Sequence, residues 1–210
     1  MMPRPALRDK PRPRAVRATG HVGWQDEIVR LDGALYSAVA TTATPELDRY
    51  FRRLSGAADH SKLWIASAGL LAAAGGQSRR RAAVNGLASI AVTSAVVNLV
   101  LKPLSRRRRP DRRRHRVPIG RRVRMPTSTS FPSGHAASAF AFATGVATAA
   151  PRAALPLSAA AALVSYSRVH TGVHYPSDVI AGSVLGAGLA PVVVAALDRR
   201  RSANAPRPEA

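Results

Sequence analysis

Two long stretches without a charged residue constrain this chain more than any other feature of its sequence. Residues 82–101 (AAVNGLASIAVTSAVVNLVL) form a run of 20 uncharged residues, and residues 179–197 form a run of 19. A helix of about 20 apolar residues, at about 1.5 Å per residue, crosses a hydrocarbon layer of about 30 Å. The two runs therefore predict transmembrane helices.

Three shorter uncharged runs cover residues 63–76, 136–150 and 153–166. Taken alone, each fits a buried helix of a soluble all-α protein equally well. Beside two full-length runs the membrane interpretation is favoured, and small Ala, Gly, Ser and Thr residues suit close helix packing there. We therefore expect an all-α, multi-pass transmembrane bundle of about five spans in the cell membrane.

The remaining segments flank this predicted membrane domain, which we place at residues 63–198. Residues 1–24 are rich in Pro and Arg and predict a disordered basic tail. Residues 25–62 hold most of the acids among spaced apolar residues, which indicates short amphipathic helices at the membrane interface. Thr44 and Pro45 predict the cap and first turn of one of them. Residues 199–210 form a polar tail.

The chain is strongly basic, with 32 Lys and Arg against 11 Asp and Glu and a net charge of +21. Such a charge first points to nucleic acid. Along the chain, however, it divides between tails, loops that flank apolar runs, and a few isolated cations. We therefore expect the bilayer as a partner and do not expect nucleic acid to be the main one. Oligomeric state is open, and without cysteine there is no disulfide or thiolate site.

Three polar segments border the apolar runs. The first runs from Lys102 to Arg109 and Pro110, the second is Phe131-Pro-Ser-Gly-His135, and the third runs from Ser167 to Asp178. Basic residues commonly flank membrane spans, and a Ser-Gly pair commonly caps a helix. Each segment alone therefore has an ordinary structural explanation.

Topology brings the three segments together. Residues 136–150 and 153–166 supply two crossings, so His135 and His174 return to the same membrane face. The segment from Lys102 to Arg109 reaches Ser133 without a crossing and lies there too. This shared face indicates a site.

The residues on this face fit a phosphate. Several cations and a helix N-terminus hold a dianion, and Asp178, four residues after His174, can fix its tautomer. Between residues 60 and 197 the only acids are Asp111 and Asp178. Because Mg²⁺ sites need clustered carboxylates, we expect no metal and no cofactor.

The ordered set Lys-x6-Arg-Pro, Pro-Ser-Gly-His and Ser-Arg-x5-His-x3-Asp resembles the signature of the type 2 phosphatidic acid phosphatase and vanadium haloperoxidase superfamily. It spans residues 102–178 and matches at every signature position. From about residue 30 onward the chain also resembles the membrane phosphatase half of some actinobacterial proteins.

The resemblance implies a role for each signature residue. His174 attacks phosphorus and becomes a phosphohistidine, Asp178 orients it, and His135 protonates the leaving oxygen and later activates water. The phosphate oxygens are held by Lys102, Arg109, Ser133, Gly134 and Arg168. His170 lies outside the signature, so we expect it either to be structural or to support the residues that contact the substrate.

The expected activity is thus metal-independent hydrolysis of a lipid phosphate or prenyl (pyro)phosphate. One alternative is a vanadate-dependent haloperoxidase, which halide oxidation with added vanadate and peroxide would reveal. Another is a non-catalytic basic membrane protein that binds anionic lipid.

The side of the membrane that the site faces is open. The catalytic face has ten loop arginines outside the signature, and the opposite face has seven. Because cytoplasmic loops carry an excess of basic residues, a difference this small does not decide the orientation.

Overall fold

The structure is a computed structural model that describes residues 23–204. Within this range the chain is helical and contains no strand. The α-helices are α1 (Trp24–Thr41), α2 (Pro45–Ala57), α3 (Lys62–Ala73), α4 (Gln77–Ala95), α5 (Lys102–Leu104), α6 (Gly134–Ala147), α7 (Ala154–His170) and α8 (Pro176–Ala203). Shorter turns are the 3₁₀ helices η1 (Asp59–Ser61), η3 (Ile119–Arg121) and η4 (Pro151–Ala153), and the π-helix η2 (Val96–Leu101).

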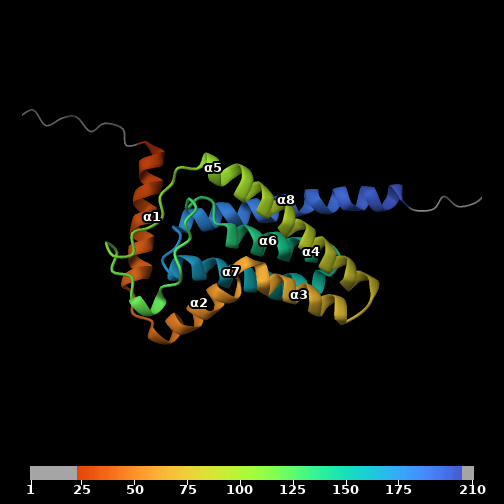
Figure 1. Cartoon of the computed structure of the whole chain (residues 1–210), viewed down its shortest axis with the longest axis horizontal. Helices are drawn as coiled ribbons and strands as arrows, with labels where there is room; N and C mark the ends of the chain where they lie inside the picture. The colour runs from red at the N-terminus through yellow and green to blue at the C-terminus, as the bar shows by residue number, and fades with distance from the viewer. Residues whose placement is uncertain (1–22, 205–210) are drawn as a thin grey trace, which may run out of the picture.

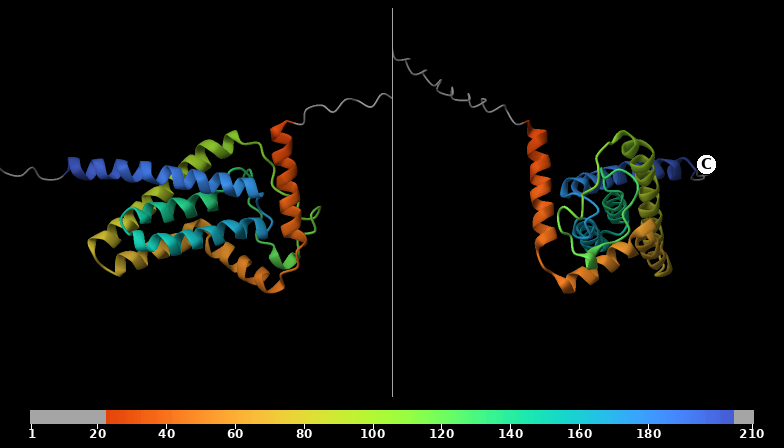
Figure 2. Two further views of the ribbon diagram at one scale, coloured as in Figure 1. Left: turned by 180° about the vertical axis from the view of Figure 1, so that it is seen from behind. Right: turned by 60° about the vertical axis from the view of Figure 1, so that its left-hand side comes forward.

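Helix α6 is the centre of the bundle, and α4, α7 and α8 pack around it (Figures 1 and 2). Its sequence is mostly Ala, Ser, Gly and Phe, and its side chains are buried on nearly every face. Phe142 is fully buried, and the centroid of its ring lies 5.5 Å from that of Trp64 in α3, with the two rings tilted. Small side chains let the neighbouring helices approach α6 closely, because little bulk separates the backbones.

Two glycines set the contact between α6 and α8. A Cβ atom at Gly182 would collide with the carbonyl oxygen of Ser133, and one at Gly186 with that of Ala137. The start of α6 therefore lies directly against α8 at Gly182 and Gly186. In this way the helix contact brings Ser133 beside Asp178, whose carbonyl accepts a 2.9 Å hydrogen bond from the Ser133 N–H.

Helix α1 runs across one end of the bundle instead of along it (Figures 1 and 2). It is anchored by Tyr36, which is buried and donates a 3.2 Å hydrogen bond to the carbonyl of Gly172. Helix α2 begins at Pro45 after Thr44, as predicted. The predicted tail of residues 1–24 lies almost entirely outside the described residues.

Among residues 23–204, two helical segments are long and apolar enough to cross a membrane. They are the continuous segment Gln77–Leu104, which joins α4, η2 and α5, and helix α8; each has 28 residues. The other helices of the bundle, α3, α6 and α7, have 12, 14 and 17 residues. Helix α8 continues to Ala203, five residues past the expected end of the membrane domain at residue 198.

Candidate active site

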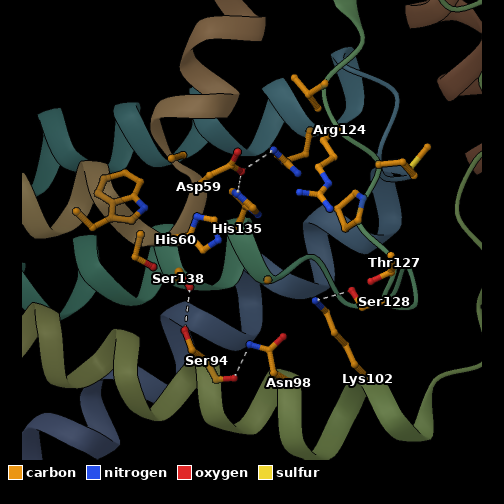
Figure 3. A pocket seen from close by; sticks show the side chains of 18 residues that line it. Asp59, His60, Ser94, Asn98, Lys102, Arg124, Thr127, Ser128, His135 and Ser138 are labelled. Carbon is orange, nitrogen blue, oxygen red and sulfur yellow. Dashed lines mark hydrogen bonds and ion pairs between the residues drawn. The ribbon is translucent and has the colours of Figure 1, made fainter.

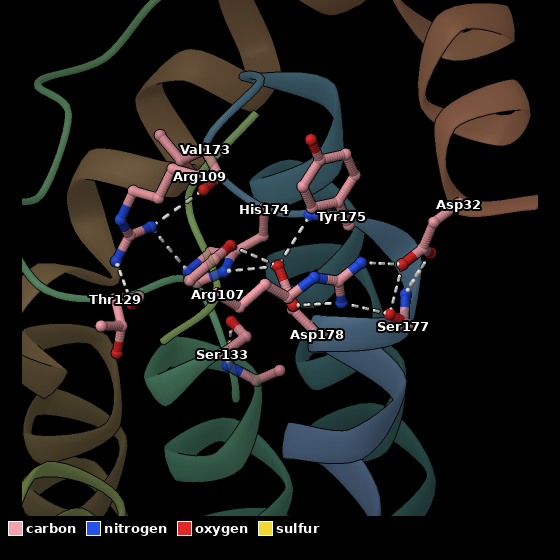
Figure 4. Close-up of polar contacts among 12 residues, drawn as sticks. Asp32, Arg107, Arg109, Thr129, Ser133, Val173, His174, Tyr175, Ser177 and Asp178 are labelled. Carbon is pink, nitrogen blue, oxygen red and sulfur yellow. Dashed lines mark hydrogen bonds and ion pairs between the residues drawn. The ribbon is translucent and has the colours of Figure 1, made fainter. Parts of the chain in front are cut away.

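The three signature segments meet near the end of the bundle that α1 crosses. A cavity of about 500 Å³ opens there, and Lys102 of α5, Gly134 and His135 of α6, and Arg168 of α7 line it (Figure 3). The loop at residues 171–175 carries His174. Arg109 lies between this histidine and Thr129 and contacts both (Figure 4). Residues more than 60 positions apart in sequence thus form one polar centre.

His174 is almost fully buried, with 2% of its surface exposed. Its Nδ1 lies 3.4 Å from Oδ2 of Asp178, and its Nε2 lies 3.2 Å from Nη1 of Arg109. Since a carboxylate only accepts hydrogen bonds, Nδ1 carries the proton and Nε2 keeps its lone pair. Burial, reinforced by the Arg109 charge, lowers the pKa of His174 to about 4. The imidazole is therefore neutral, and a nucleophile, at pH 7.

Arg109 is fixed from several sides. Nη1 donates a 2.9 Å hydrogen bond to the carbonyl of Val173, and Nε donates a 2.8 Å bond to that of Ser128. A third bond of 3.2 Å runs from Nη2 to the Thr129 carbonyl. These bonds hold the guanidinium against Nε2 of His174, where it can bind the oxygens of a phosphate under attack.

Asp178 is completely buried and accepts hydrogen bonds from three residues in the loops around it. Its Oδ2 accepts from the backbone N–H of Tyr175 at 2.9 Å and from the hydroxyl of Ser130 at 2.5 Å. Its Oδ1 accepts from Nη1 of Arg107 at 2.7 Å (Figure 4). These donors compensate for its buried charge and fix the carboxylate that faces His174.

Arg107 links Asp178 to helix α1. While one guanidinium nitrogen binds Asp178, the other binds the carboxylate of Asp32 (Figure 4). Asp32 is 3% exposed and also accepts a 2.9 Å bond from the N–H of Ser177, at the start of α8. Two ion pairs through Arg107 therefore link Asp32 of α1 to Asp178, which lies beside His174.

The start of α6 combines capping with free backbone donors. The buried hydroxyl of Ser133 accepts a 3.5 Å hydrogen bond from the N–H of Ala136, so this side chain caps the helix. The first N–H groups of a helix have no partner within it and attract anions. The ammonium of Lys102 lies beside Gly134 and is 3.2 Å from the hydroxyl of Ser128.

Arg168 reaches the cavity from the last turn of α7. It is 2% exposed, and its Nη1 donates to the hydroxyl of Ser55 in α2. The same nitrogen lies 3.7 Å from the carboxylate of Asp59, while Nε has no partner among the described residues. A buried guanidinium with unused donors is suited to hold an anion.

His135 follows Gly134 at the start of α6, and 23% of its side chain is exposed. Its Nε2 lies 2.8 Å from Oδ1 of Asp59, so that nitrogen carries a proton (Figure 3). Its other ring nitrogen, Nδ1, makes no hydrogen bond within residues 23–204. His135 can therefore exchange a proton through Nδ1 while Asp59 holds its opposite edge.

The sequence interpretation missed Asp32, Asp59 and Arg107. The two acids lie in the segment taken to be interfacial, and Arg107 was counted with ordinary loop arginines. Arg121 was also counted with the loop arginines, although it is fully buried and its Nε lies 2.6 Å from Oδ1 of Asp48. A signal for these contacts was available, because acids are scarce in a chain of +21 charge. His170 also binds Asp48, at 2.9 Å.

Carboxylates and imidazoles are distributed over the site and not gathered at one point. Across residues 23–204, no three His, Asp or Glu side chains cluster closely enough to hold a metal ion. The groups that are gathered are cations and single donors, which suit a phosphate.

Comparison with known proteins supports the resemblance. Residues 82–202 match the sequence profile described as PAP2 superfamily. The chain is 38% identical over 144 residues to decaprenylphosphoryl-5-phosphoribose phosphatase of Mycobacterium tuberculosis, which covers 68% of this chain and 76% of that protein.

Solved structures share the fold. The first transmembrane PAP2 type phosphatidylglycerolphosphate phosphatase from Bacillus subtilis matches with a TM-score of 0.63 and 24% identity, over 83% of this chain and 88% of that one. LpxE of Aquifex aeolicus matches with a TM-score of 0.62 and 24% identity, over 79% and 95%. The resemblance drawn from the three motifs is confirmed, and the chain belongs to the PAP2 superfamily.

Proposed function

We propose that the protein is a metal-independent membrane phosphatase that hydrolyses a lipid phosphate or a prenyl (pyro)phosphate through a phosphohistidine at His174. One observation carries the proposal: a neutral buried imidazole, oriented by Asp178, meets Arg109 beside a cavity lined by Lys102, His135 and Arg168. A nucleophile and fixed cations in one place are what phosphoryl transfer requires.

In the first step the lone pair of His174 Nε2 forms a bond to phosphorus. The bond from phosphorus to the lipid oxygen breaks, and that oxygen leaves with its electron pair. It takes a proton from His135, so the lipid alcohol is released neutral. Asp178 accepts the Nδ1–H of His174 and offsets the positive charge that the imidazole ring gains.

In the second step a water oxygen attacks the phosphohistidine. Its proton passes to His135, the bond from phosphorus to Nε2 breaks, and the electron pair returns to His174. Inorganic phosphate leaves, and the protonated His135 is ready for the next substrate. During both steps Lys102, Arg109, Arg168 and the α6 N-terminus neutralise the phosphate oxygens.

The position of the site beside membrane-length helices and the names of the relatives both support a lipid phosphate as the substrate. The Mycobacterium tuberculosis relative is named for a phosphorylated sugar carried on a decaprenyl lipid. A site beside membrane-length helices meets amphiphilic phosphates first. Decaprenylphosphoryl-5-phosphoribose, phosphatidic acid and isoprenyl diphosphates are therefore the substrates to assay.

The proposed topology has about five membrane spans, formed by α3, the segment Gln77–Leu104, α6, α7 and α8. The short helix α6 is compatible with this arrangement because its neighbours enclose it and shield it from lipid. Ser105 and Ala203 should then lie on opposite faces. Single cysteines at these positions of the cysteine-free chain should react with a membrane-impermeant thiol reagent from opposite sides.

The test of the activity uses purified protein in detergent with EDTA present. Phosphate release from at least one of the three lipid phosphates is expected, and the His174→Gln variant should release none above background. Loss of the wild-type activity on chelation, recovered when Mg²⁺ is restored, would contradict the metal-independent mechanism.

A further inference from the structure

The turn between α2 and α3 delivers a carboxylate to the catalytic cavity. Asp59 opens the 3₁₀ helix η1 and lines the cavity beside His135 (Figure 3). It accepts a 2.8 Å hydrogen bond from Nε2 of His135 and lies 3.7 Å from Nη1 of Arg168. It also lies outside residues 82–202, so the match to the family gives it no role.

The charges around His135 oppose its protonation. Lys102 and Arg168 line the same cavity as His135, so a protonated imidazole would be the third positive charge there. Asp59 is the carboxylate that faces it, and the hydrogen bond from His135 lowers the pKa of Asp59, so that this group is ionised at neutral pH. The neighbouring His60 adds to that lowering. Without Asp59, His135 would face only cations and neutral groups.

The backbone of the turn is held in an uncommon conformation. His60 and Ser61 both have left-handed dihedral angles, with φ of 56° and 59°. Such angles are uncommon for residues with a side chain and persist where the surrounding structure imposes them. The same corner supplies Ser55, which binds Arg168. The end of α2 and the turn that follows it therefore both contact signature residues.

We propose that Asp59 is a positioning residue for the leaving-group acid: its carboxylate holds Nε2–H of His135, favours the protonated ring, and turns Nδ1 toward the leaving oxygen of the substrate. The relation is that of the carboxylate and histidine in other acid–base pairs, where the acid fixes the ring and its tautomer. The proposal rests on the proposed function, because it requires His135 to donate a proton to that oxygen.

The proposal distinguishes substrates by their leaving group. A lipid alcohol is a poor leaving group and needs the proton from His135, whereas p-nitrophenolate leaves without one. In Asp59→Asn, kcat for phosphatidic acid or a prenyl phosphate should fall by about tenfold or more, with little change in KM. The kcat for p-nitrophenyl phosphate should fall by less than about twofold. Asp59→Glu should recover part of the lipid-phosphate activity.

A matched control is available in Asp198, at the far end of α8. Its side chain is 38% exposed, close to the 45% of Asp59, and it is likewise paired with arginine, here Arg81 and Arg201. Asp198→Asn makes the same chemical change and should leave both activities as they are. The melting temperature of both variants separates a loss of catalysis from a loss of folding.

Three results would overturn the role of Asp59. One is equal slowing of both substrates together with a fall in melting temperature that Asp198→Asn lacks. Another is a lower KM with unchanged kcat, which would mean that Asp59 merely occupies the phosphate position. The third is an additive loss when Asp59→Asn is combined with His135→Ala. If His135→Ala itself keeps full activity on lipid phosphates, the proposed mechanism fails as a whole.

Discussion

The guanidinium of Arg107 lies 2.7 Å from the carboxylate of Asp178 and at the same time binds Asp32 of α1. Arg107 therefore connects helix α1 to the carboxylate that lies beside His174. It lies between Lys102 and Arg109 of the first motif, at a position that the motif leaves unspecified. Asp32, which anchors α1, and Asp178, the carboxylate that we propose to be catalytic, thus share one cation.

The first prediction concerns this cation. Arg107→Gln removes one charged donor from Asp178 and leaves Asp32 without its partner. A charge-assisted hydrogen bond contributes about 1.5 to 3 kcal/mol, so kcat should fall by about tenfold to a hundredfold. Phosphate release under saturating lipid phosphate measures the effect.

The control for this variant is the neighbouring Arg106, which is exposed. Arg106→Gln makes the same change in net charge without touching Asp178, so its kcat should match the wild type. Equal losses in the two variants would show that the loop's overall charge matters and that the contact with Asp178 does not.

The second prediction concerns stability and pH. Burial lowers the pKa of His174 to about 4, whereas an unfolded histidine titrates near 6.5. Between these values the unfolded chain binds a proton that the folded chain does not. The free energy of unfolding should therefore decrease as the pH falls from 6.5 to 4, by about 3 kcal/mol from this residue.

Thermal unfolding of the detergent-solubilised protein at several pH values checks this expectation. His174→Gln cannot titrate, so its melting temperature should change less than that of the wild type over the same range. Parallel curves for the two proteins would mean that His174 takes up its proton over the same pH range in the folded and unfolded chains, which would contradict a lowered pKa.

The third prediction concerns the contact between α6 and α8. In Gly186→Ala the new methyl group meets the carbonyl of Ala137, and overpacking should lower the free energy of unfolding by about 1 to 3 kcal/mol. Gly188 lies in the same helix with open space around its Cβ position. Gly188→Ala should leave stability unchanged or slightly increased, and a similar loss in both would argue against the close approach.

The sequence was most informative where function places several residues close together along the chain. The predicted crossings placed the three motifs on one face, and in the structure Lys102, His135 and Arg168, one residue from each motif, line one cavity. The long apolar runs predicted the two 28-residue helical segments. Local spacing and hydrophobicity are enough for both inferences, since each depends on neighbouring residues.

The partners of those residues were not predictable in the same way. Asp59 is 76 positions from His135, and Asp32 is 75 from Arg107. No local pattern marks either acid, because the contact depends on how α1 and the turn after α2 cross the bundle. Arg107 and Arg121 also look like the other loop arginines in the sequence. In the structure they differ because each is paired with an acidic side chain.

The central claim, that His174 becomes phosphorylated, can be measured directly. The protein is incubated briefly with a ³²P-labelled lipid phosphate, quenched in alkali and digested, and the labelled peptide is identified. We predict a label on His174 that is stable in alkali, lost in acid, and missing in His174→Gln. Full wild-type turnover with no label on His174 at any quench time, or the same label in His174→Gln, would contradict the account.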